Sequence, residues 1–197
     1  MELQLPKPTL EGSKSLEECI YKRESVRNYS NKKIRIELIS QLLWATQGKK
    51  GQKRTVPSAG ATYPLEIYAI IKEEGFFHYN LVKHSLELIT DNDISNDLVK
   101  ESWNQRFIKE AFLNIIICAD YSRTTQRYGE RGVRYVHIEV GHCAQNIHLE
   151  AVALGLASVP IGAFQDNGVK RVMNLPKNID PLYIIPIGYP REGKDLI

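Results

Sequence analysis

The sequence predicts one domain of the α+β class, with an antiparallel or mixed central sheet flanked by helices. The chain has 197 residues, the usual length of a single domain. Hydrophobic residues make up 43% of it and charged residues 25%, close to the average of globular proteins. Helix and strand patterns follow one another without the regular alternation of a doubly wound parallel sheet. We therefore expect residues 1–197 to form one domain, with residues 1–14 as an extended arm.

The first third of the chain contains two well-marked helices. Ser15-Leu16-Glu17-Glu18 is a capping box, which predicts a short helix over about residues 15–22. Apolar residues recur at helical spacing over residues 36–47, and Gly48 suits the C-terminal cap of that helix. Residues 49–54 are mostly basic, and residues 57–61 are mostly small. Both segments are therefore expected to be loops.

The rest of the chain predicts short strands and helices around one long helix. That helix is expected over residues 134–154, where Val140, Ala144 and Ile147 share one face and many small residues permit close packing. A helix that is apolar nearly all round belongs at the centre of a fold. The other expected elements are strands at 65–72, 76–79, 86–89, 114–119, 157–161 and 182–188, and helices at 94–103, 107–111 and 166–173.

Charge, cysteine content and hydropathy exclude several classes of protein. The net charge of +3 is too small to indicate nucleic-acid binding by itself. Cys19, Cys118 and Cys143 are not at metal-ligand spacing, so no metal site is expected, and their apolar surroundings are typical of buried thiols in a reducing compartment. The longest apolar run, residues 113–119, is far short of the about 20 residues that span a bilayer. Since the N-terminus also lacks a signal-like segment, we expect a soluble cytoplasmic protein.

A first candidate site is Arg23-Glu24-Ser25-Val26-Arg27. In an extended segment Arg23, Ser25 and Arg27 project to the same side. Two guanidinium groups and a hydroxyl suit a phosphate dianion, because each planar fork matches two phosphate oxygens. The alternative is a solvated basic surface.

Two further segments contain small residues next to proline. Pro57, Ser58, Ala59 and Gly60 would let the backbone approach a flat ligand, with amides and the Ser58 hydroxyl as donors. The alternative is a tight turn into the next strand. In the segment 159–164 a predicted strand ends at a proline and a glycine. One interpretation is that its amides point into a cleft. The alternative is that the segment is simply the end of a strand.

A polar segment, residues 126–135, is expected to be a loop that leads into the long helix. Tyr128 is flanked by Arg127, Arg131 and Arg134, which would stabilise a phenolate or help the hydroxyl to donate a proton. Further along, Glu139-x-x-His142 matches half of a di-iron helix motif, but a partnered core histidine is expected instead. Rossmann, P-loop and nucleophile-elbow motifs do not occur.

Taken in order, these segments resemble the FMN-dependent nitroreductase superfamily from about residue 15 to residue 190. The resemblance implies that Arg23, Ser25 and Arg27 bind the FMN phosphate and that the segment Pro57–Gly60 lies on the flavin of the partner subunit. It implies that a backbone amide in Pro160, Ile161, Gly162 and Ala163 meets flavin N5. After the last strand, which ends in Ile-Gly-Tyr-Pro, it implies that Arg191 or Lys194 reaches the phosphate. The segments 144–147 and 153–156 are similar to the central dimerisation helix of the family.

Two details resemble the SagB-type, or azoline dehydrogenase, branch. One is the form Pro-Ser-Ala-Gly-Ala-x-Tyr-Pro at residues 57–64. The other is the run from Arg127 to Asn146. Enzymes of that branch oxidise thiazoline or oxazoline rings in modified peptides and have a Lys-Tyr pair where this chain has Arg127-Tyr128. Arginine does not act as a base at neutral pH, so this substitution argues against azoline oxidation and leaves flavin binding unaffected. Arg127 and Tyr128 are the candidate catalytic residues.

The function expected from the resemblance is that of a homodimeric FMN-dependent oxidoreductase. NAD(P)H would reduce the flavin, and a nitroaromatic or quinone would take the electrons. The first alternative is dehydrogenation of azoline rings. One alternative of another class is a nucleic-acid-binding module that uses the basic run at 49–54. That run lacks the interleaved aromatic residues on which bases would stack. Another alternative is a protein that carries FMN or uses it as a substrate.

Overall fold

A seven-stranded antiparallel sheet organises the computed structural model, which describes residues 1–191. Every strand pair of this sheet is antiparallel. β7 lies inside the sheet, between β4 and β9, and is buried along its whole length. The strands, in spatial order, are β1 (Glu2–Gln4), β6 (Ser85–Thr90), β5 (Gly75–Asn80), β4 (Leu65–Ile71), β7 (Leu113–Ala119), β9 (Asp180–Gly188) and β8 (Ala157–Ser158). The predicted α+β class is confirmed.

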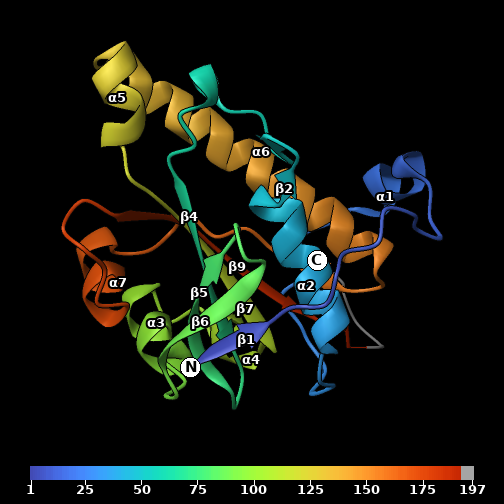
Figure 1. Ribbon diagram of the computed structural model, residues 1–197. Helices are drawn as coiled ribbons and strands as arrows, with labels where there is room; N and C mark the ends of the chain where they lie inside the picture. The colour runs from blue at the N-terminus through green and yellow to red at the C-terminus, as the bar shows by residue number, and fades with distance from the viewer. Residues whose placement is uncertain (192–197) are drawn as a thin grey trace.

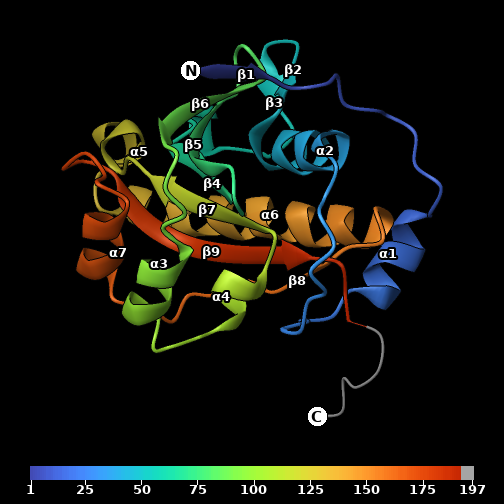
Figure 2. The same ribbon diagram turned by 90° about the horizontal axis from the view of Figure 1, so that it is seen from below.

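Helices cover both faces of the sheet, as Figure 2 shows. On one face α2 (Ile36–Gln47) and α6 (Arg131–Ala153) pack their apolar sides on the inward residues of β4, β7 and β9. On the other face lie α3 (Ser95–Glu101), α4 (Phe107–Glu110) and α7 (Asp166–Val172). The remaining helices stand at the two ends of α6 in Figure 1; they are α1 (Leu16–Lys22) and α5 (Ser122–Tyr128).

The helices predicted from caps and periodicity are confirmed. The Glu18 amide donates to Ser15 Oγ at 3.1 Å, so Ser15 is the N-cap of α1. α2 has the predicted bounds, and the Gly48 amide donates to the Trp44 carbonyl at its C-cap. These signals are local in sequence, which is why the prediction needed no tertiary information.

Four predicted segments differ from the structure. The arm begins with an edge strand, β1, paired with β6. The basic run forms a hairpin of β2 (Lys49–Lys50) and β3 (Lys53–Arg54) around Gly51, which has a φ of +60°. Beyond β8 the predicted strand at 157–161 is interrupted, since Pro160 has no N–H to donate, and pairing with β9 resumes only at Ile161.

The fourth difference concerns the predicted loop at 126–135. α5 extends to Tyr128 and α6 begins at Arg131, so Gly129 and Glu130 alone separate the two helices. Gly129, with a φ of +58°, ends α5. The polar composition suggested a loop, but the surface of an amphipathic helix has the same composition. Within residues 1–191 no helix, α6 included, is long and apolar enough to cross a membrane.

Candidate active site

The segment with Arg23, Ser25 and Arg27 lies along the edge of the sheet. Ser25 forms a parallel bridge with Ser158 of β8, and the Val26 amide donates to the Ser158 carbonyl at 3.1 Å. The Arg191 amide donates to the Asn28 carbonyl at 3.2 Å, which brings the end of the described chain to the same place. The structure therefore brings this predicted segment together with Arg191. Lys194, the alternative to Arg191, lies outside the described residues.

A buried tyrosine fixes the backbone of this segment. The Tyr29 hydroxyl lies 2.7 Å from the Val26 carbonyl oxygen and 3.1 Å from that of Pro186. Gly188 leaves room for the ring, because a Cβ there would stand 2.9 Å from it. Arg23 is half-buried, whereas Ser25 and Arg27 are exposed.

The arginines of this edge have no acidic partner within residues 1–191. The ion pairs of the described chain include none with Arg23, Arg27 or Arg191. The Arg27 guanidinium instead lies 6.0 Å from the centre of the Phe107 ring. Basic side chains without carboxylate partners are suited to bind an anion, so we refer to Arg23, Ser25, Arg27 and Arg191 as the candidate anion receptor.

The predicted N5-contact segment follows directly from β8. Ile161 pairs with Ile184 of β9, its amide donating at 2.8 Å. Gly162 and Ala163 are exposed. Their amides donate to no protein atom within residues 1–191, while the Ala163 carbonyl accepts from Gln105 Nε2 at 2.8 Å. Two fixed backbone donors therefore lie beyond the Arg23–Arg27 segment and are available to a ligand.

The loop predicted to lie against a flavin ring has a strained backbone. Pro57 and Ser58 lead into the single turn η1 (Ala59–Ala61). The φ angles are +58° at Gly60, +54° at Ala61 and +48° at Tyr63. Left-handed conformations at two residues other than glycine are uncommon and persist where surrounding contacts hold them.

Residues of α5 hold this loop from outside. Arg127 Nη1 donates to the Gly60 carbonyl at 3.2 Å, and Arg123 Nη1 donates to that of Tyr63 at 3.2 Å. The Tyr128 hydroxyl lies against Gly60, where a Cβ would stand 2.5 Å from it. The two predicted segments at 57–60 and 127–128 are therefore in direct contact.

A buried polar network supports the same loop from inside. Glu139 is 2% exposed and accepts from Gln47 Nε2 at 3.3 Å, and Gln47 Oε1 accepts from Arg54 Nη1 at 3.1 Å. Ser58 Oγ accepts from the Tyr63 amide at 2.9 Å and lies close enough to Glu139 to lower the pKa of that carboxyl. The Ser58 hydroxyl therefore already has a partner within the chain. Burial raises the pKa of Glu139 above its usual value.

Sequence reasoning missed Glu139 and misjudged its neighbour. His142 is exposed, not a core residue, and the glutamate of that pair is the buried member. The signal was available, since position 139 lies among Val136, Val140 and Cys143, which are all buried on α6. Arg54 is part of this network, and its guanidinium lies 4.2 Å from the centre of the Tyr63 ring, whereas residues 49–53 of the basic run are exposed.

The two clusters lie at opposite ends of α6 (Figure 1). Pro57, Ser58 and Ala59 line a small cavity with Tyr135 near the start of the helix. The Arg23 segment lies near its end, where Ser158 Oγ is 3.1 Å from His148 Nδ1. From residue 135 to 148 the helix rises about 20 Å. Within one chain, the segment Arg23–Arg27, which is predicted to bind a phosphate, therefore lies too far from the Pro57–Gly60 loop for both to contact the same small ligand.

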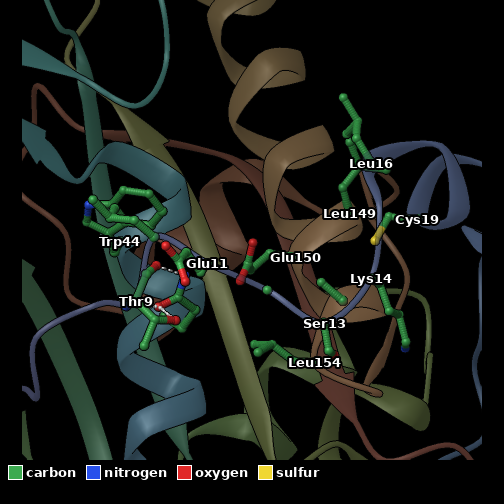
Figure 3. A pocket seen from close by; sticks show the side chains of 14 residues that line it. Thr9, Glu11, Ser13, Lys14, Leu16, Cys19, Trp44, Leu149, Glu150 and Leu154 are labelled. Atoms are coloured by element: carbon green, nitrogen blue, oxygen red, sulfur yellow. Dashed lines mark hydrogen bonds between the residues drawn. The ribbon is translucent and has the colours of Figure 1, made fainter.

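A separate cavity of about 420 Å³ lies under the N-terminal arm (Figure 3). Gln41 holds the arm there, accepting from the Thr9 amide at 2.9 Å and donating to the Thr9 carbonyl at 3.1 Å. Glu11 and Glu150 line it, and burial raises the pKa of Glu150. None of the predicted site residues lines this cavity.

The chain belongs to the nitroreductase family of oxidoreductases, because the model described as "Nitroreductase family" matches residues 20–189. A protein of Methanocaldococcus jannaschii with a provisional nitroreductase name is 43% identical over 195 residues, covering 95% of this chain and 96% of its own. The microcin B17-processing protein McbC of Escherichia coli is 25% identical over 184 residues, covering 86% of this chain and 68% of McbC. The family and the likeness to SagB-type relatives predicted from sequence are confirmed.

Solved structures show the same fold. A provisionally named nitroreductase of Ralstonia eutropha superposes with a TM-score of 0.88 at 24% identity, covering 98% of this chain and 90% of the other. The NADPH:FMN oxidoreductase of Vibrio harveyi, complexed with NAD⁺, superposes with a TM-score of 0.70 at 20% identity, covering 92% and 71%.

Proposed function

We propose that this protein is a homodimeric FMN-dependent oxidoreductase. The observation that carries the proposal is the division of the site between the two ends of α6. The segment Arg23–Arg27 of the candidate anion receptor lies near one end of the helix. The loop with left-handed residues at Gly60, Ala61 and Tyr63 lies near the other. A two-fold dimer that crosses at α6 would bring the receptor of one subunit to the loop of its partner.

The residues present fit FMN. Its phosphate needs cations without internal partners, which Arg23, Arg27 and Arg191 provide, with Ser25 as a further donor. Its ring needs fixed donors near N5, which the amides of Gly162 and Ala163 provide. When bound, FMN supplies hydride transfer at N5. The chain's own part is to hold the phosphate, orient the ring and place the segment Pro57–Gly60 of the partner against it.

The surface of the chain supports dimer formation. Leu10 is 84% exposed and Tyr21 is 89% exposed, near Leu16 and Ile20 on α1. On α6, Ile138 is 49% exposed. Gly141 on the same helix has no atom within 4 Å of the place where a Cβ would stand, so nothing inside the chain accounts for a glycine in mid-helix. Close approach of a second copy would account for it.

NAD(P)H is the reductant that we propose, with a nitroaromatic or quinone as acceptor. The likeness to the NADPH:FMN oxidoreductase of Vibrio harveyi supports this choice. Tyr128, held beside Gly60, would donate a proton to the reduced acceptor, and Arg127 would keep the loop in place.

Dehydrogenation of azoline rings is the second candidate function. The likeness to McbC, a microcin-processing protein, favours it, together with the position of Arg127-Tyr128 beside the loop. A peptide carrying a thiazoline would be converted to the thiazole and would bleach the flavin without NAD(P)H. A nitroaromatic would be reduced only when NAD(P)H is present, which separates the two activities.

Mixed dimers test the divided site. A chain with Arg23→Ala and Arg27→Ala lacks the receptor, and a chain with Gly60→Ala has a displaced loop. Each homodimer should lose activity, whereas a heterodimer keeps one intact site and should recover up to about half of the wild-type activity per dimer. Visible spectra of the wild type, bleached anaerobically by NAD(P)H, test the cofactor itself. Colourless protein that binds no added FMN, or mixed dimers without recovery, would contradict the proposal.

A further inference from the structure

His148 lies next to Ser158, the residue that pairs with the anion receptor, and one of its ring nitrogens has no hydrogen-bond partner within residues 1–191. The side chain leaves α6 near its end and is 3% exposed. Its Nδ1 lies 3.1 Å from Ser158 Oγ. Its Nε2 is enclosed and has no hydrogen-bond partner within residues 1–191. Buried polar atoms are nearly always partnered, so this nitrogen calls for a partner from outside the chain, either a water or a ligand.

The imidazole is joined to the receptor through Ser158. The Ser158 backbone pairs with Ser25 and Val26, so the hydroxyl that meets Nδ1 belongs to the strand that pairs with the receptor segment. Burial first, and the charge of Arg23 second, lower the pKa of His148 to about 4. The ring is therefore neutral at pH 7 and has one N–H. When the Ser158 hydroxyl donates to Nδ1, that proton is on Nε2.

Resting on the proposed function, we infer that His148 is a further phosphate-binding residue, whose Nε2–H donates to a phosphoryl oxygen of the cofactor. Arg23 makes no ion pair in the described chain and is half-buried, so its side chain is free to bind the same phosphate. Ser158 holds the ring from behind and determines which nitrogen faces the anion.

Two amide variants separate the two ring nitrogens. In His148→Asn the amide stands near the Nδ1 position and keeps the bond to Ser158, but nothing replaces Nε2. In His148→Gln the longer side chain carries an N–H to the Nε2 position. FMN and riboflavin differ only in the phosphate, so the ratio of their dissociation constants isolates the phosphate contact. Both are measured by fluorescence titration of the full-length chain after removal of bound flavin.

We expect His148→Asn to weaken FMN binding by about tenfold or more and to leave riboflavin binding within about twofold. His148→Gln should retain FMN binding within about threefold. His137→Asn, on the same helix with its Nε2 2.6 Å from the Tyr121 hydroxyl, is the control and should change neither. Equal losses for the two flavins, or no loss of FMN binding in His148→Asn, would overturn the inference and leave the proposed function standing.

A second measurement needs neither a variant nor a flavin. In ¹⁵N-histidine-labelled wild type, inorganic phosphate should shift the Nε2 resonance of His148 in a saturable way and leave that of His137 unchanged. An Nε2 resonance that does not respond overturns the inference, even if the asparagine variant fails to fold. Wild type that binds neither flavin would count against the proposed function, and the phosphate titration would still decide the role of His148.

Discussion

The hydroxyl of Tyr128 stands against the backbone of Gly60, so closely that a Cβ on the glycine would lie 2.5 Å from it. The two residues are far apart in sequence and come from the two segments that sequence analysis treated as separate candidates. Gly60 also has a φ of +58°. Glycine therefore suits this position for two reasons, because it adopts the left-handed backbone without strain and leaves room for the Tyr128 hydroxyl.

Replacing Gly60 by alanine should therefore displace the loop. The left-handed backbone alone costs alanine about 1–2 kcal/mol, and the contact with Tyr128 adds to it. We expect a lower melting temperature in thermal unfolding followed by circular dichroism, together with reduced activity. The matched control is Gly51→Ala, where φ is +60° and nothing lies within 4 Å of a Cβ. Equal effects of the two substitutions would show that the contact with Tyr128 is unimportant.

Replacing both Arg23 and Arg27 by alanine should remove the anion receptor. Each charged hydrogen bond contributes about 1.5–3 kcal/mol, so FMN affinity should fall by several kcal/mol while the fold is retained. Flavin content after purification and a fluorescence titration measure this. Arg35→Ala, at an exposed position before α2, serves as the control. Unchanged flavin occupancy in the double variant would refute the assignment.

Tyr128→Phe keeps the ring, which packs edge-on against Tyr135, and removes only the hydroxyl. If that hydroxyl donates a proton, turnover should fall by about 10²-fold or more, with flavin content unchanged. Tyr121→Phe, which removes the nearby hydroxyl bonded to His137, should keep turnover within about threefold. Turnover of Tyr128→Phe within the same limits, over a broad set of acceptors, would make Tyr128 a structural residue.

The raised pKa of Glu139 predicts that the stability of the folded chain falls as the pH rises. Its pKa is raised above 4.5 in the folded chain, so the folded state binds a proton more tightly than the unfolded state does. The contribution of this carboxyl to stability is therefore present at acid pH and is lost as the pH rises from about 4.5 through the folded pKa. Relative to Glu139→Gln, the wild type should lose stability between pH 4 and pH 7. Urea unfolding of both proteins across this range measures it, and parallel curves would contradict it.

Ile138→Asp places a charge on the exposed side of α6, on the surface proposed for the dimer. We expect monomers in analytical ultracentrifugation and loss of FMN binding, since an obligate interface of about 2,000 Å² or more does not accept an unpaired central charge. Val82→Asp changes another exposed apolar residue, 70% exposed against 49% for Ile138, at the β5–β6 turn and should leave the dimer intact. A monomeric variant that still binds FMN would refute the divided site.

The elements that could be predicted are those whose signals are local. The capping box at Ser15, the apolar period of residues 36–47 and the strand predicted at 114–119 depend on neighbours a few residues away, and each formed within one residue of the expected bounds. The short helix α5 and the β2–β3 hairpin escaped prediction, because polar segments of a few residues look alike whether they are loops, hairpins or helix surfaces. Their conformation depends on what they pack against.

The sequence by itself determined the class, the order of the elements and the family, since periodicity, caps and small-residue motifs all reside in short runs of the chain. Only the tertiary structure decided which of those runs meet. It joined Tyr128 to Gly60, Glu139 to Gln47 and His148 to Ser158, and set the two candidate clusters at opposite ends of α6. These contacts join residues far apart along the chain, and they form because packing on a common sheet brings the elements together, which no local pattern encodes.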